Sequence, residues 1–119
     1  MPQRLLFVYN ADAGLLAGLK DTFHKILSPS TYACALCAVT YGATSIRPEW
    51  RAFIKSLPVP VEFLHRDEFV WAYPAWARHQ LPAAFAVAET GTLKPFIEAE
   101  EMNAADLNGL MELVRQKLA

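Results

Sequence analysis

Two cysteines three positions apart, in Cys34-Ala-Leu-Cys37, carry the clearest chemistry in this sequence. Where such a pair opens a helix, the two sulfurs can bridge, and the free backbone N–H groups favour the thiolate of the first cysteine. That thiolate attacks a disulfide, and the second thiol resolves the mixed disulfide. The pattern therefore predicts thiol–disulfide exchange, with Cys34 as the nucleophile and Cys37 as the resolving thiol.

The same spacing is compatible with two other roles. The cysteines could be small buried core residues, or they could form half of a zinc site together with a histidine, for which His65 is the candidate. If residues 32–40 form a strand, Cys34 and Cys37 point to opposite faces and cannot bridge. All three interpretations stay open, and the leading one needs no metal and no cofactor.

A second group of candidates is His65-Arg66-Asp67-Glu68, which follows the apolar run Val59–Leu64. His65 could act as an acid or base, and Arg66 could hold an anion. The alternative is a charged turn with an Asp cap on the next helix. Asn10–Gly14 follows the first apolar run, and α/β proteins bind ligands at the carboxyl ends of such strands. His79 lies in an expected loop without a recognisable partner.

Aromatic side chains gather between residues 69 and 76, at Phe69, Trp71, Tyr73 and Trp76. One interpretation is a set of core aromatics that covers the sheet. The other is a surface for a protein partner or a second copy, because Trp and Tyr are enriched at such interfaces.

The hydrophobic pattern predicts strands alternating with helices. Strands are expected at 4–9, 59–64, 83–88 and 93–99, and helices at 15–27, at 48–57, within 67–78 and after Asn103 as the N-cap, while 31–42 is ambiguous. Alternation predicts parallel pairing with helices on both faces of the sheet. The last two strands, joined by the turn Glu89–Thr92, predict a closing hairpin followed by a helix.

This element order, with a CxxC upstream of Leu81-Pro82, resembles the thioredoxin-like fold. The resemblance implies a mixed central sheet, a protein thiol or disulfide partner, and a cis Leu81–Pro82 bond that faces the cysteines and shapes the partner groove. The chain departs from that family in three ways. Its CxxC comes soon after an expected helix and not directly after a central strand, and Ala-Leu replaces the usual Gly-Pro. Tyr32-Ala33 also stands where the family has a tryptophan before the first cysteine. A non-catalytic thioredoxin-like module that binds a protein is therefore the alternative.

The chain is also similar to a group of short bacterial proteins, some labelled GTPases, in the phrases VYNADAG, HKILSPSTYACALCAVTYG and FLHRDEF. The GTPase label has no support from motifs here. A phosphate-binding loop needs GxxxxGK[ST], and no such glycine-rich segment with its lysine is present.

Composition narrows the remaining possibilities. With 119 residues, the chain is expected to form a single domain over 1–119. A net charge of -1 argues against a nucleic-acid partner. The uncharged stretch 26–46 is long enough to span a bilayer, but its Ser, Thr, Pro and Gly content argues against a membrane segment. With two cysteines and no signal-peptide pattern, a cytoplasmic location is expected.

Overall fold

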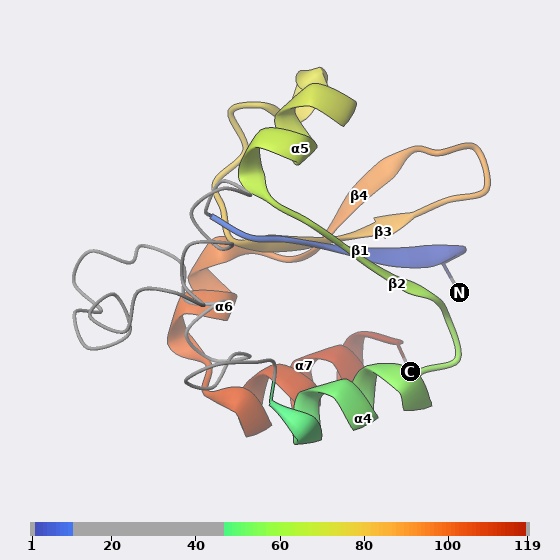
Figure 1. Cartoon of the computed structure of the whole chain (residues 1–119), viewed down its shortest axis with the longest axis vertical. Coiled ribbons are helices and arrows are strands. Elements are labelled where there is room, and N and C mark those ends of the chain that lie inside the picture. Colours follow the sequence, from blue (N-terminus) through green and yellow to red (C-terminus); the bar gives the residue numbers. More distant parts are fainter. Residues whose placement is uncertain (1, 11–46, 119) are drawn as a thin grey trace.

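The computed structural model describes residues 2–10 and 47–118 (Figure 1). In chain order the elements are β1 (Arg4–Val8), α4 (Pro48–Ser56), β2 (Val61–Leu64), α5 (Arg66–Ala72), the 3-10 turn η2 (Pro74–Trp76), β3 (Ala83–Val87), β4 (Leu93–Ile97), α6 (Ala99–Ala104) and α7 (Leu107–Leu118). The helix expected at 15–27, the ambiguous segment 31–42 and both cysteines lie outside the described residues.

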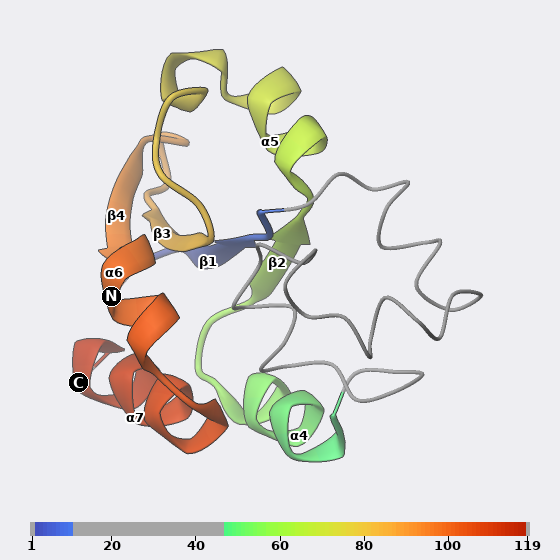
Figure 2. The same ribbon diagram turned by 90° about the vertical axis from the view of Figure 1, so that its left-hand side faces the viewer.

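The four described strands form one mixed sheet in the order β2-β1-β3-β4. β1 pairs with β2 in parallel, while β3 is antiparallel to both β1 and β4. Figure 2 shows β4 and β2 as the two outer strands of the sheet, with β3 and β1 between them. The prediction of an α/β fold with a mixed sheet and a closing hairpin is confirmed. β2 is two residues shorter than expected, and Pro60 outside it accepts a backbone hydrogen bond from Leu5.

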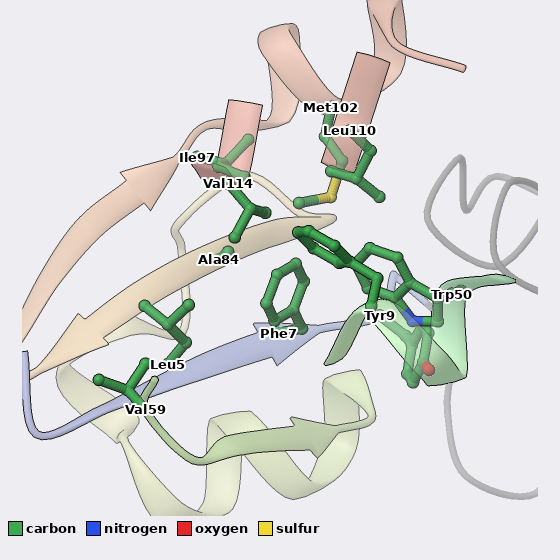
Figure 3. Close-up of a cluster of buried hydrophobic side chains, with 11 residues drawn as sticks. Leu5, Phe7, Tyr9, Trp50, Val59, Ala84, Ile97, Met102, Leu110 and Val114 are labelled. Carbon is green, nitrogen blue, oxygen red and sulfur yellow. The ribbon is translucent and has the colours of Figure 1, made fainter. Parts of the chain in front are cut away.

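One face of the sheet packs against α4, α6 and α7 (Figures 1 and 3). The periodicity of α4 turns Trp50 and Phe53 toward this face, as its apolar stripe predicted. Buried side chains of this cluster are Leu5, Phe7, Tyr9, Trp50, Phe53, Val59, Ala84, Ile97, Met102, Leu110 and Val114. The alternation of Leu5, Phe7 and Tyr9 along β1 places them together, because successive strand residues point to opposite faces.

The opposite face packs against α5 and η2. Leu6, Val8 and Phe85 of the sheet meet the buried Phe69 of α5. Helical structure therefore covers both faces, as predicted. This cover on both faces also explains why the sequence of β1 is a nearly continuous apolar run, since both faces of the strand are buried.

The hairpin between β3 and β4 turns at Gly91. Its φ of 84° lies in the left-handed region, where glycine avoids the clash that a Cβ would cause. The N–H of Gly91 donates to the carbonyl of Ala88, and the N–H of Ala88 donates to the carbonyl of Thr92. The predicted turn over Glu89–Thr92 is confirmed.

The segment after β4 differs from the prediction. Asn103 is not the cap of the last helix, because it lies inside the short helix α6, which the sequence pattern did not predict. The strand expected to reach Ala99 ends at Ile97, since Glu98 and Glu101 begin α6: the Glu101 Oε1 accepts the backbone N–H of Glu98 at 3.2 Å. The last helix is capped instead by Asp106, whose Oδ1 accepts the N–H of Gly109 at 2.7 Å.

Candidate functional site

The candidate site lies at the end of the sheet where the parallel strands β1 and β2 have their carboxyl ends. This end of the sheet is named the carboxyl edge. Val8 lies opposite Leu64 in β2 and opposite Ala83 in β3. β3 therefore begins at this edge, with Pro82 immediately before it. Ala84 pairs with Ile97, so β4 ends there too, and Glu98 follows. The carboxyl edge consists of Tyr9, His65, Pro82 and Glu98.

Pro82 is buried, and the Leu81–Pro82 bond is cis, as the resemblance to thioredoxin-like proteins implied. A proline immediately before a strand costs no ladder hydrogen bond within it. The expected contact between Pro82 and the cysteines falls outside the described residues. Pro82, His65 and Arg66 were predicted as binding residues, and the structure places Pro82 and His65 at the same edge, with Arg66 next in sequence to His65.

His65 is held by Glu68. The Glu68 Oε1 accepts the backbone N–H of His65 at 2.8 Å and also contacts the His65 Nδ1. The hydrogen bond from the His65 backbone, and next the one from its side chain, hold the pKa of Glu68 below its ordinary value of 4.5. His65 occupies the N-cap position of α5, so Asp67 is not the cap that the sequence suggested. Asp67 instead accepts the N–H of Glu68 within the first turn.

The imidazole of His65 also packs on Tyr9, with ring centroids 5.6 Å apart. Its side chain is 27% exposed. A carboxylate that contacts Nδ1 orients the ring, and an imidazole oriented this way can exchange a proton at Nε2. Arg66, the first residue of α5, is exposed beside it.

A second histidine–carboxylate pair lies at the same edge and was missed by sequence reasoning. The Nε2 of His79 lies 2.8 Å from the Oε1 of Glu98. These residues are 19 positions apart, and no motif connects them. The predicted hairpin is the sequence signal that could have indicated this pair. In a hairpin the second strand ends beside the start of the first, so Glu98 lies where the loop from η2 enters β3.

The aromatic segment divides into two parts. Phe69 is buried, and Tyr73 and Trp76 pack partly buried on the same face of the sheet. Trp71 is 86% exposed and Val70 is borderline at 36%. The interpretation as a cover of core aromatics therefore holds for three of the four residues. Trp71 is the one available to a partner.

Metal-ligating side chains do not cluster in the described part of the chain. Within 2–10 and 47–118, no three His, Cys, Asp or Glu side chains gather to hold a metal ion. His65 is engaged with Glu68, and the two cysteines of the proposed zinc set lie outside the described residues.

A surface hollow lies at the opposite end of the sheet, away from these residues. Its lining includes Gln3, Ala86, Lys94, Phe96 and Lys117. No predicted site residue of the described part lines it. The carboxyl edge, where strand ends bring several candidates together, is therefore the better candidate site.

Comparison with family models, with curated proteins and with solved structures found no match to this chain. In the described part of the chain, no helix is both long and apolar enough to cross a membrane.

Proposed function

We propose that this chain is a thioredoxin-like domain that exchanges thiols and disulfides with a protein partner through Cys34 and Cys37. The support comes first from the sheet. Two parallel strands, then an antiparallel hairpin and a terminal helix, agree with the element order that the resemblance implies. Helical elements pack on both faces, as such a domain requires.

The pairing of Val8 with Ala83 carries the proposal. Because of it, the chain leaves β1 at Tyr9 beside the point where Pro82 leads into β3. The segment that continues from residue 10 to Cys34 therefore starts next to the proline that would shape the partner groove. The register of β1 and β3 brings these two parts of the sequence, some 70 positions apart, to one edge.

The proposed chemistry balances without a cofactor. The Cys34 thiolate attacks one sulfur of a partner disulfide, which forms a mixed disulfide and releases the partner's other sulfur as a thiolate. The Cys37 thiolate then attacks the Cys34 sulfur and releases the second partner thiolate, and both released thiolates take protons from water. The partner gains two electrons, and the chain keeps a Cys34–Cys37 disulfide.

The test is the intact mass of the protein in glutathione buffers of defined potential. We expect a reversible loss of two hydrogen atoms, abolished in both Cys34→Ser and Cys37→Ser. The two variants are matched controls for the roles. With a disulfide substrate, Cys37→Ser should accumulate a mixed disulfide through Cys34, and Cys34→Ser should not. Two thiols that stay free at every potential would overturn the proposal, and zinc in freshly purified protein would favour the Cys/His site instead.

A second candidate is a non-catalytic module that binds a protein, and the exposure of Trp71 favours it. An indole this exposed is a side chain that interfaces often bury. The two functions separate in one comparison. If Trp71→Ala abolishes binding of a captured protein partner while Cys34→Ser leaves it unchanged, the binding module is favoured.

A further inference from the structure

The loop from residue 77 to residue 82 connects η2 to β3 and ends at Pro82. Its far end is anchored by the sheet, where Ala83 pairs with Val8. Its near end is anchored by hydrogen bonds from the N–H of Ala77 to the carbonyl of Pro74 and from the N–H of His79 to the carbonyl of Trp76. The middle of the loop is held through the side chain of His79.

His79 lies against two aromatic rings and one carboxylate. Its ring centroid is 5.3 Å from that of Trp76 and 5.1 Å from that of Phe85, both edge to face. These contacts leave the side chain 19% exposed and turn its Nε2 toward Glu98, at 2.8 Å. Glu98 is fixed in turn, because it directly follows β4 and occupies the N-cap position of α6.

We propose that the His79–Glu98 pair is a clip that positions the Pro82 loop, and that protonation of His79 tightens it. Pro82 follows His79 by three residues, so the clip keeps it within about 10 Å of a fixed point. A protonated imidazole makes an ion pair with the Glu98 carboxylate, while a neutral imidazole makes a hydrogen bond without that attraction. The link to partner binding rests on the proposed function. The clip itself does not.

The groups that surround His79 favour Glu98 as the carboxylate that holds its side chain. η2 and β3 present apolar rings, Trp76 and Phe85. Glu98, the N-cap residue of α6, makes the contact, while Glu101 within α6 is paired with Lys117 at 3.1 Å. Glu100 is exposed and lines a hollow with Gln80, and the neighbouring Arg78 is exposed. Within the described residues, Glu98 is the carboxylate bonded to His79, so the response to pH depends on this pair.

Hydrogen exchange of the loop amides, measured between pH 6 and pH 8, tests the clip. Protection of the His79 and Ala77 amides should rise about two- to fivefold toward pH 6, the range of a partly exposed ion pair. Glu98→Gln and His79→Phe should abolish this pH dependence, and the phenylalanine keeps the ring packing. Glu100→Gln removes a carboxylate two residues away, in the first turn of α6, and should keep the dependence. An unchanged pH dependence in Glu98→Gln would overturn the clip.

The link to the partner groove is tested with the rate at which a disulfide peptide is reduced. Glu98→Ala should lower kcat/KM about two- to fivefold relative to Glu100→Ala. If the loop loosens in Glu98→Ala but this rate is equal in the two variants, the pair does not position the groove. If the wild-type protein reduces no disulfide, the proposed function and this link both fail, and the exchange data still decide on the clip.

Discussion

Phe7 on β1 meets Trp50 on α4 edge to face, with ring centroids 5.5 Å apart and planes at 80°. This contact joins β1, one of the two inner strands, to the helix that precedes β2. Phe63 on β2 lies against both rings, so the aromatic group spans two parallel strands and α4. We infer that it stabilises the part of the sheet from which the carboxyl edge extends.

Truncation of Trp50 should be severely destabilising. Trp50 is fully buried, and its replacement by alanine loses the ring contacts and leaves a cavity. We expect Trp50→Ala to cost about 3–5 kcal/mol of unfolding free energy, measured by urea denaturation. Trp50→Phe keeps an aromatic ring at this position, and the indole Nε1 that it removes has no hydrogen-bond partner within the described residues, so it should cost less.

Trp71 provides the matched control, because it is the same residue type on α5, the next helix along the chain, and is 86% exposed. Trp71→Ala should change the unfolding free energy by no more than about 0.5 kcal/mol. Equal losses for Trp50→Ala and Trp71→Ala would contradict the placement of α4 against the sheet.

Gly91 should resist replacement by alanine for a conformational reason. A Cβ at this position would meet no atom within 4 Å, but its φ of 84° is unfavourable for residues that have one. Gly91→Ala should therefore cost about 1–2 kcal/mol. Gly91→Asn should cost less, because asparagine tolerates left-handed geometry. A thermal unfolding series would contradict this account if alanine were the better tolerated of the two.

The spacing of apolar residues predicted most of the described helices and strands, because each of these elements buries one or both of its faces. β1 is buried on both faces, and Trp50 and Phe53 follow helical spacing toward one face. α6 was missed because its six residues are too few to show a period. The helix begins at the capping contact between Glu98 and Glu101. In the sequence alone, these two glutamates are equally compatible with the end of an exposed strand.

The candidate site was predictable only where it depends on strand order. Parallel strands bring their carboxyl ends together, so the placement of His65 beside the end of β1 follows from the alternation of strands and helices. The contact between His79 and Glu98 depends on tertiary packing around Phe85 and has no local signal. The pairing of Cys34 with Cys37 stays a prediction.

The start of α7 gives a direct test of the corrected cap. Asp106→Ala removes the hydrogen bond from the Gly109 N–H and should cost about 0.5–2 kcal/mol. Asn103→Ala is the control, because Asn103 lies exposed within α6 and alanine is a good helix former. Chemical denaturation that found the larger loss in Asn103→Ala would restore Asn103 as the cap.

Glu68 should contribute to the loss of stability in acid. Hydrogen bonds from His65 keep its pKa below the ordinary value of 4.5 in the folded state. A carboxyl with a depressed folded-state pKa stabilises the protein fully above its unfolded pKa, and this contribution is lost as the pH falls through the folded value. The glutamate is 45% exposed, so solvent screening keeps the effect small.

Glu68→Gln should therefore lower the unfolding free energy at pH 7 by no more than about 1 kcal/mol, and the difference from wild type should shrink below pH 4.5. The measurement is a series of urea midpoints from neutral pH into acid. Glu49→Gln is the matched control, because Glu49 lies in the first turn of α4 and so shares the favourable helix dipole. If both variants follow the same pH profile, the dipole accounts for the effect and the bonds from His65 contribute nothing measurable. A gap confined to Glu68→Gln assigns the stabilisation to the His65–Glu68 pair at the carboxyl edge.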